Sequence, residues 1–221
     1  MHRPAACLFD LDGLLLDTEP LHARAWQEAA SHFGRPLEAE ELMALRGRRR
    51  HDCADQVRHW IASSGGPQLS RKELLAVRQP IAEALLPTAA PMPGARELVE
   101  RCTELAVPMA LATSSSREAV ALKATPHPWL EPIAVRVHGD DPELAAGKPA
   151  PDVFLLAAAR LGVEASDCWA FEDSPAGARS ALAAGCRVHV LPPTHLDGDA
   201  IAGLYPGIER FMSSLAEVQI S

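Results

Sequence analysis

The chain has 221 residues, 48% of them hydrophobic and 23% charged, a composition typical of a globular protein with one large domain or a core and a smaller companion. Its net charge of −8 argues against non-specific binding to nucleic acid. No window approaches the roughly 20 apolar residues of a membrane-spanning helix, and we expect neither a membrane partner nor a signal peptide. The five cysteines form no CxxC pair, so we expect free buried thiols in a reducing cytoplasm.

The first predicted element is a buried strand at residues 5–9 (AACLF), which ends where charged residues begin. The segment FDLDGLLLDTE, residues 9–19, then places three aspartates and a glutamate beside an apolar run. Two carboxylates about 4 Å apart repel each other by roughly 4 kcal/mol at an effective dielectric constant of about 20. Such a cluster is tolerated in a wet loop, around a cation, or where chemistry needs the acids.

A long helical region is predicted from about residue 20 to residue 86, because apolar residues recur at helical spacing and β-branched residues are few. Within it, Ser70 and Glu73 have the spacing of a capping box. The proline-rich segment 87–95 (PTAAPMPGA) predicts a stiff extended connector.

Beyond residue 95, predicted helices alternate with short apolar strands. This alternation favours an α/β fold with a Rossmann-like parallel sheet between two helical layers. The helical region would then be an insert after the first strand. We predict a core of residues 1–16 and 90–221 and a small helical domain, linkers included, of residues 17–89. No long heptad pattern is present, so we expect a monomer.

Polar residues follow the predicted strands. In open parallel sheets, ligands bind at the carboxyl ends of the strands. Hydroxyls and acids occupy those ends, and one lysine lies in a loop before a helix. These residues are Asp10, Asp12, Thr113, Ser114, Lys148, Glu172 and Asp173. The set predicts a site for phosphate and a metal ion.

Four segments of the chain resemble the four motifs of the haloacid dehalogenase-like (HAD) hydrolase superfamily, in the family's order. They are FDLDGLLLDTE, LATSS, GKPAPDVF and FEDSPAGARSALAAG. One DxD pair also occurs in wet turns, but four motifs in register are specific. The resemblance covers nearly the whole chain and implies that the helical insert is the small cap domain of this superfamily.

The resemblance implies a role for each matching residue. Asp10 matches the nucleophile and Asp12 the general acid/base. Thr113 and the backbone N–H of Ser114 match the phosphate-binding groups, and Lys148 matches the lysine that balances charge.

The resemblance also implies a Mg²⁺ cofactor. Asp10, Asp173 and the backbone carbonyl of Asp12 match its ligands, and Glu172 would support the metal through its waters. We expect the Asp12 side chain to lie on the same face as Asp10, with its carboxyl free to protonate the leaving group and then to activate water.

Structural interpretations compete with these roles. Thr113 and Ser114 could cap the helix that begins near residue 117, and Asp173 could cap the helix that follows it. Lys148 could be a solvated surface lysine, although its Gly-Lys-Pro setting favours function.

Four residues of the insert are candidates for substrate contact: Glu19, His22, Arg46 and Arg50. Glu19 could instead stabilise a helix start, and His22 could be a packing residue near the hinge. A basic cluster such as LRGRRRHD is usually a solvated face, but a cap facing an anion site could use Arg46 and Arg50 to bind substrate.

Asp12 favours phosphoryl transfer, since dehalogenating members of the superfamily lack that residue. We predict a phosphatase for a small phosphorylated metabolite, similar to the subgroup that contains pseudouridine-5'-phosphatase and glycerol-phosphatases. A β-phosphoglucomutase-like enzyme is the alternative. A non-catalytic regulator that binds a phosphorylated ligand ranks lower, because Asp10, Asp12, Lys148 and Asp173 are all present.

Overall fold

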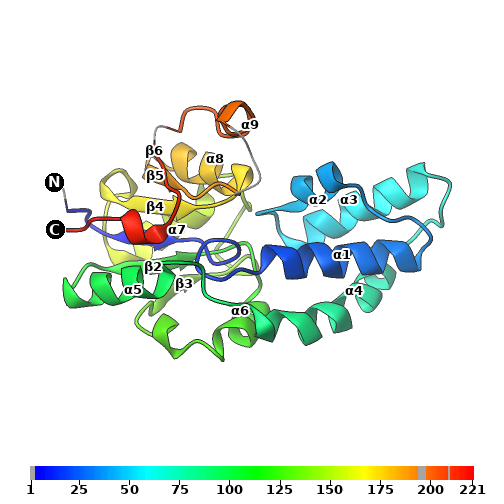
Figure 1. Ribbon diagram of the computed structural model, residues 1–221, viewed down its shortest axis with the longest axis horizontal. Coiled ribbons are helices and arrows are strands. Elements are labelled where there is room, and N and C mark those ends of the chain that lie inside the picture. The colour runs from blue at the N-terminus through cyan, green and yellow to red at the C-terminus, as the bar shows by residue number, and fades with distance from the viewer. Residues whose placement is uncertain (1–2, 194–197, 209) are drawn as a thin grey trace.

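The computed structural model describes residues 3–193, 198–208 and 210–221. A six-stranded parallel sheet forms the centre of the protein, and a group of helices extends beyond one end of it (Figure 1). The strand order is β3-β2-β1-β4-β5-β6. The strands are β1 (Cys7–Phe9), β2 (Met109–Ala112), β3 (Val135–Val137), β4 (Trp169–Glu172), β5 (Arg187–Val190) and β6 (Arg210–Phe211).

Strand β1 lies in the middle of the sheet because its three residues, CLF, are apolar and fully buried on both faces. Phe9 stacks on Phe171 of β4, with ring centroids 5.0 Å apart. The chain leaves β1 for β2 on one side and later returns to β4 on the other side. Connections therefore diverge around the carboxyl end of β1, which leaves a crevice there.

Helices cover both faces of the sheet, as the alternating pattern predicts. Leu98 of α5 packs in the same cluster as Phe9, whereas Phe154 of α7 packs with Leu8 on the opposite face. The core helices are α5 (Ala95–Glu104), α6 (Arg117–Ala124), α7 (Asp152–Leu161), α8 (Pro175–Ala183) and α9 (Gly198–Leu204). Single-turn 3₁₀ helices are η1 (Leu86–Thr88), η2 (Pro128–Leu130), η3 (Ala165–Asp167) and η4 (Leu215–Glu217). The predicted α/β fold with a Rossmann-like sheet is confirmed.

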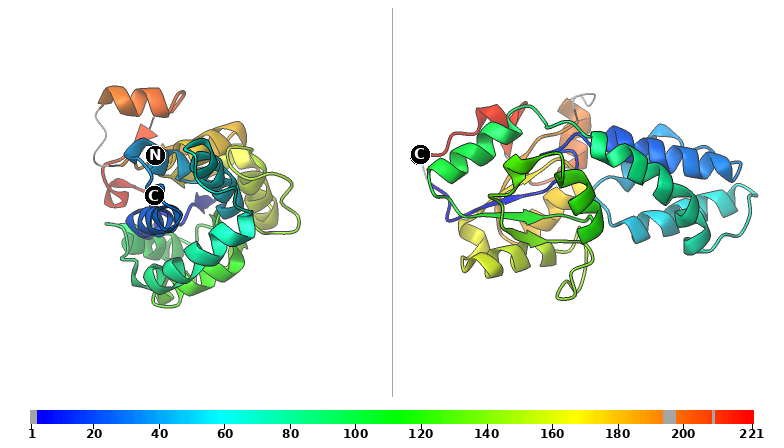
Figure 2. Two further views of the ribbon diagram at one scale, coloured as in Figure 1. Left: turned by 90° about the vertical axis from the view of Figure 1, so that its right-hand side faces the viewer. Right: turned by 90° about the horizontal axis from the view of Figure 1, so that it is seen from below.

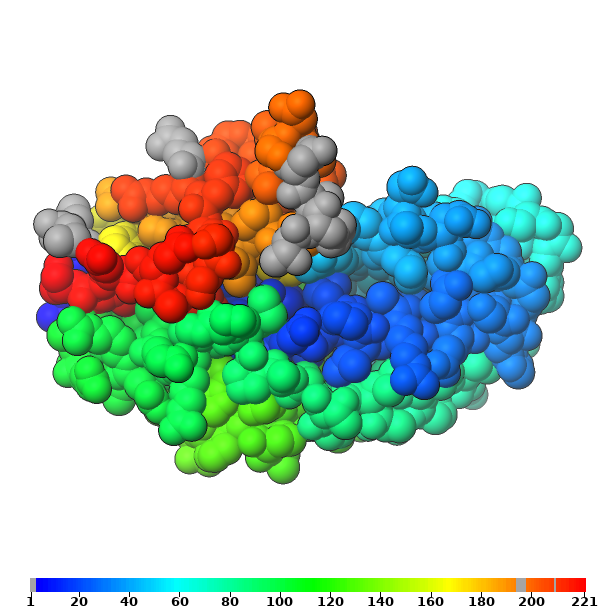
Figure 3. Space-filling model, in the orientation of Figure 1, coloured from blue at the N-terminus to red at the C-terminus, as the bar shows by residue number. Residues whose placement is uncertain are grey.

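The helical insert consists of α1 (Glu19–His32), α2 (Ala39–Leu45), α3 (Arg50–Ser63) and α4 (Arg71–Leu85). It has a hydrophobic cluster of its own, which includes Trp26, Val57 and Leu74. The insert forms a lobe beyond the carboxyl ends of the strands (Figures 2 and 3). The predicted capping box of Ser70 and Glu73 starts α4.

The two segments that connect the sheet to the insert run side by side. The N–H of Asp17 donates to the carbonyl of Ala90, and the N–H of Met92 donates to that of Leu15. The proline-rich connector thus pairs with the segment after β1. Across the described ranges, no helix is both long and apolar enough to span a membrane.

Candidate active site

A cavity of about 1080 Å³ lies between the carboxyl end of the sheet and the insert. Asp10 and Asp12 line it from the loop after β1, and Arg46, Arg50 and Arg78 line it from the insert. Residues far apart in the sequence meet here because parallel strands end at the same edge of the sheet.

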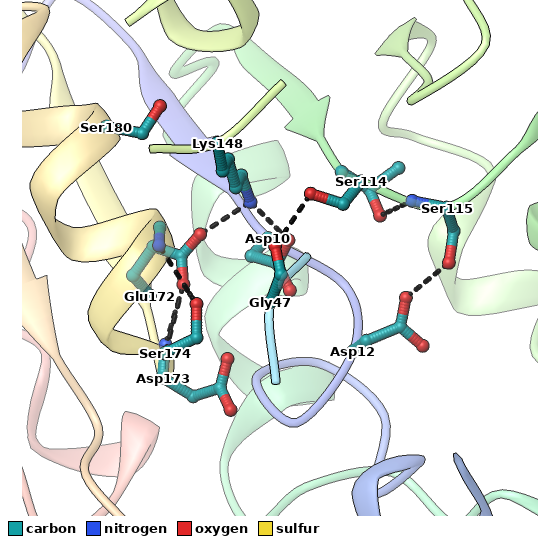
Figure 4. Close-up of polar contacts among 12 residues, drawn as sticks. Asp10, Asp12, Gly47, Ser114, Ser115, Lys148, Glu172, Asp173, Ser174 and Ser180 are labelled. Atoms are coloured by element: carbon teal, nitrogen blue, oxygen red, sulfur yellow. Dashed lines mark hydrogen bonds and ion pairs between the residues drawn. The ribbon is translucent and has the colours of Figure 1, made fainter. Parts of the chain in front are cut away.

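Asp10 is buried at the end of β1 and forms an ion pair with Lys148 (Figure 4). The Lys148 ammonium lies 2.5 Å from Oδ1 of Asp10 and 2.5 Å from Oε1 of Glu172. Burial raises the pKa of Asp10 to about 7, and the neighbouring carboxylates Glu172 and Asp12 add to the rise, while Lys148 opposes it. Lys148 is therefore buried between two acids and is not a solvated surface lysine.

Glu172 uses its second carboxylate oxygen to organise the start of α8. Oε2 accepts the backbone N–H groups of Asp173 and Ser174 and the Ser174 hydroxyl. The Ser174 hydroxyl accepts the N–H of Gly177 and so caps α8. The alternative that Asp173 is the cap of this helix is wrong, which leaves its carboxylate available to the site.

Asp10, Glu172 and Asp173 form a candidate metal centre, since each offers an oxygen within 4.8 Å of the others. Among the described residues, Oδ1 of buried Asp173 has no hydrogen-bond partner. Burial raises the pKa of Asp173 well above its ordinary value, and Arg46 opposes the rise. A compact set of buried oxygen donors with one unsatisfied atom suits a hard cation such as Mg²⁺.

Charge balance supports the same conclusion. When all four are ionised, the carboxylates of Asp10, Glu19, Glu172 and Asp173 face two paired cations, Lys148 and Arg46, which leaves two negative charges. One Mg²⁺ carries two positive charges.

The loop after β1 passes close to Asp173 at Gly13. A Cβ at Gly13, where φ is +85°, would lie 2.3 Å from Oδ2 of Asp173, so the close approach requires glycine.

Asp12 points away from Asp10 and toward Ser115 (Figure 4). The sequence predicts a free carboxyl on the same face as Asp10, whereas the structure shows one that accepts five hydrogen bonds. The donors are the Thr18 hydroxyl at 2.6 Å, His22 Nε2 at 3.1 Å, the Ser115 hydroxyl at 2.7 Å and, twice, Lys123 Nζ at 2.5 and 2.6 Å. The pKa of Asp12 lies well below its ordinary value because Lys123 and His22 outweigh burial.

His22 connects Asp12 to helix α4 of the insert. Arg78 Nη2 lies 3.0 Å from Nδ1 of His22, and arginine can only donate, so Nδ1 accepts. The ring proton is then on Nε2, which donates to Asp12. Burial lowers the pKa of His22, which favours this neutral form.

Thr113 and Ser114 lie at the end of β2, and each hydroxyl has a partner. The buried Thr113 hydroxyl accepts the N–H of Ser115 at 3.1 Å. The Ser114 hydroxyl donates to the carbonyl of Gly47 in the insert at 2.8 Å. Ser116 caps α6, so neither Thr113 nor Ser114 is the cap.

The loop between α2 and α3 touches the core at the candidate metal centre. Arg46 Nη2 donates to Oδ2 of Asp173 at 2.6 Å, and its Nε lies 3.2 Å from Glu19. Burial raises the pKa of Glu19 to about 7, although Arg46 opposes the rise. Arg50 instead donates to Gln79 at 2.8 Å within the insert and lines the cavity.

A profile of the haloacid dehalogenase-like hydrolase family matches residues 4–185. The chain belongs to this family. The family assignment agrees with the resemblance of the four sequence motifs and with the geometry of the site that they form.

Relatives of this HAD-like hydrolase include named phosphatases. A probable pseudouridine-5'-phosphatase of Drosophila melanogaster is 37% identical over 203 residues, which cover 89% of this chain and 85% of the fly protein. The fructose-1-phosphate phosphatase YqaB of Escherichia coli (strain K12) is 35% identical over 184 residues, covering 83% of this chain and 94% of that protein. These relatives confirm the predicted phosphatase class.

A solved structure with the same fold is that of CbbY from Rhodobacter sphaeroides in complex with xylulose-(1,5)bisphosphate. It superposes with a TM-score of 0.80 at 28% identity and covers 97% of this chain and 96% of that one. The likeness extends over both the sheet and the helical insert.

The sequence interpretation of this HAD-like hydrolase misses Lys123, Ser115, Thr18 and Arg78. Lys123 had one signal in the sequence, because it follows Val120 by three residues and so shares a helix face with that apolar residue; in the structure both are buried. The other three lie near predicted site residues, but nothing in their spacing indicates contact with Asp12 or His22.

Proposed function

We propose that this HAD-like hydrolase is a Mg²⁺-dependent phosphatase that removes phosphate from a small metabolite through an aspartyl-phosphate on Asp10. The observation that carries the proposal is the buried Asp10–Lys148 pair beside the acidic cluster of Glu172 and Asp173. A carboxylate held this way can attack phosphorus, and the ammonium offsets the charge repulsion between the two anions.

The chemistry demands strong charge stabilisation, since phosphate monoesters are among the slowest substrates to hydrolyse. Asp10 and Asp173 would hold the metal, with the Asp12 carbonyl as a further ligand, and Glu172 would support it through bound water. Bound Mg²⁺ would supply positive charge to the phosphoryl oxygens. Lys148 adds a fixed positive charge next to Asp10.

Asp12 would protonate the leaving oxygen and then activate water against the aspartyl-phosphate. In the present arrangement its carboxylate faces Ser115, so it must turn toward the substrate in each turnover. Thr113 and the Ser114 N–H at the end of β2 are the proposed phosphate-binding groups.

The insert, residues 17–89, is the proposed cap. Its loop contacts support this: Gly47 accepts the Ser114 hydroxyl, and Arg46 reaches Asp173. Glu19, His22, Arg46 and Arg50 are proposed to shape the substrate cavity. A cytoplasmic monomer is proposed as well; the five cysteines are free and buried, in keeping with a reducing compartment.

The test is phosphate release from a panel of esters with Mg²⁺ and with EDTA. The panel contains pseudouridine-5'-phosphate, glycerol phosphate, fructose-1-phosphate and β-glucose-1-phosphate. Mg²⁺-dependent release with one preferred ester supports the proposal. Conversion of β-glucose-1-phosphate to glucose-6-phosphate without phosphate release would make the protein a mutase. No reaction with any ester would favour a binding role.

A further inference from the structure

Lys123 is a second buried lysine at this site. The chain has three lysines: Lys72 is exposed on α4, and Lys148 and Lys123 are buried, each against a different aspartate of the loop after β1. Lys148 pairs with Asp10 and Lys123 with Asp12. The reaction described above gives Lys123 no role.

All three N–H groups of the Lys123 ammonium have acceptors, on Asp12 and Ser115. Its side chain has no exposed surface, and its three protons match three acceptors: Oδ1 of Asp12 at 2.5 Å, Oδ2 at 2.6 Å and the Ser115 hydroxyl at 2.7 Å. Ser115 in turn donates to Asp12 at 2.7 Å. An ammonium is buried at a cost of several kcal/mol unless it is paired, so this position of α6 depends on the Asp12 carboxylate.

A purely structural ion pair needs only to connect two elements. The Lys123–Asp12 pair also fixes the direction of the Asp12 carboxylate, because Lys123 bonds to both of its oxygens while Ser115 bonds to Oδ2 and His22 to Oδ1. Two of the donors, Lys123 and Ser115, come from the core, whereas His22 belongs to the insert. The core contacts therefore hold Asp12 without the insert.

We propose that Lys123 is a positioning residue for the general acid/base: its ammonium holds the Asp12 carboxylate in one orientation between turnovers, from which the carboxylate turns toward the substrate. The proposal rests on the phosphatase function stated above. Replacing Lys123 should therefore slow the steps that use Asp12 and leave the contacts among Asp10, Lys148 and Asp173 unaffected.

The test compares Lys123→Met with Asp12→Asn on two substrates, an alkyl phosphate and 4-nitrophenyl phosphate. The alkoxide needs a proton to leave, but nitrophenolate does not. For Lys123→Met we expect kcat/KM on the alkyl phosphate to fall at least about tenfold, and kcat/KM on the aryl phosphate to change less than about threefold. Aryl kcat should still fall, because hydrolysis of the aspartyl-phosphate needs the base. Asp12→Asn should show the same pattern more strongly.

The ratio of the two kcat/KM values does not depend on the fraction of folded enzyme, which cancels. An unchanged alkyl-to-aryl ratio, as equal losses on both substrates would give, or a rise in that ratio would overturn the proposal. Lys123→Arg should restore part of the ratio, and Lys72→Met is the matched control at an exposed lysine. If Lys123→Met does not fold, Ser115→Ala removes the neighbouring contact and must shift the ratio in the same direction. Failure of the phosphatase function itself is distinct, since the wild-type chain would then release no phosphate from any ester.

Discussion

The Nζ atom of Lys148 lies 2.5 Å from Oδ1 of Asp10, and both side chains are buried. Even with this cation, burial keeps the pKa of Asp10 at about 7. One ammonium therefore does not compensate the acids gathered around Asp10. A further positive charge would offset these acids, which links the proposed nucleophile to the proposed metal site.

Asp10→Asn should abolish turnover, with a loss of at least about 10³-fold in kcat, because a neutral amide cannot form the aspartyl-phosphate. Steady-state phosphate release with the preferred ester checks this. Asp167→Asn is the matched control, since Asp167 is exposed before β4 at the opposite end of the sheet. An Asp10→Asn enzyme that keeps a tenth of the wild-type rate would end the assignment of the nucleophile.

Magnesium binding should weaken as the pH falls below about 7. The pKa of Asp10 in the metal-free fold is raised from 3.8 to about 7, so the carboxyl is protonated below that pH, and the proton competes with the metal. We expect the apparent Mg²⁺ affinity to fall at least about tenfold per pH unit between pH 7 and pH 5, because the metal displaces at least one proton and the pKa of Asp173 is raised as well. Calorimetric titration in two buffers of different ionisation enthalpy measures both the affinity and the protons released.

A Mg²⁺ affinity that does not change across this range would contradict the raised pKa of Asp10. Asp173→Asn tests the ligand set in the same experiment and should weaken Mg²⁺ by at least about tenfold. Sodium chloride at matched ionic strength controls for screening.

Asp12→Asn should stop chemistry on alkyl phosphates while leaving Mg²⁺ affinity within about threefold of wild type. The physical reason is that the Asp12 carboxylate faces Lys123 and Ser115 and not the acidic cluster. Asparagine keeps the shape of the side chain and one acceptor oxygen for Lys123, whereas Asp12→Ala removes both acceptors; either change takes the counter-charge from the buried ammonium. A large loss of metal affinity in Asp12→Asn would show that this carboxylate is itself a ligand.

Arg50→Ala should raise KM for the preferred ester more than for 4-nitrophenyl phosphate, because Arg50 lines the cavity from the insert. Arg46→Ala should differ, since Arg46 bonds to Asp173 and its loss should alter the Mg²⁺ dependence as well as KM. Lys72→Ala, on the exposed face of the insert, is the control. Equal rises in KM on both substrates would remove Arg50 from substrate recognition.

Much of the fold and the acidic site could be predicted from the sequence, for a physical reason. Parallel strands end at one edge, so the residues that follow each strand, such as Asp10 and Asp173, must meet there. The predicted first strand, residues 5–9, is shorter in the structure at Cys7–Phe9, but its end is the same, and that end sets the position of Asp10.

The direction of the Asp12 carboxylate could not be predicted in the same way. It depends on donors from the loop after β1, from α1 and from α6, whose mutual placement follows from packing and not from local pattern. Likewise, Arg46 and Arg50 are four residues apart, yet one reaches Asp173 and the other Gln79. The path of the loop between α2 and α3 decides this, and residue type alone does not reveal it.

His189 should make the fold sensitive to acid. Its ring packs against Trp169 and Phe171 of β4, at 4.9 and 5.0 Å between centroids, and its Nε2 has no hydrogen-bond partner among the described residues. Burial lowers the pKa of His189 to about 4, with Arg210 and Arg187 adding to the effect. Between pH 6.5 and pH 4 the unfolded chain therefore binds a proton that the fold resists, so stability falls as the pH falls.

His189→Phe should remove this contribution, which is about 3 kcal/mol at most across that window. Denaturant unfolding at pH 7, 6, 5 and 4.5 gives the free energy of unfolding of both proteins, and the contribution of His189 is the difference between their slopes against pH. A destabilisation by the larger phenylalanine ring that is the same at every pH does not affect this difference. His59→Phe, the same substitution at an exposed histidine of α3, should leave the wild-type slope unchanged. Parallel slopes for wild type and His189→Phe would mean that the folded protein accommodates a charged ring at this position, and the acid sensitivity of the fold would then have to come from the buried acids of the active site.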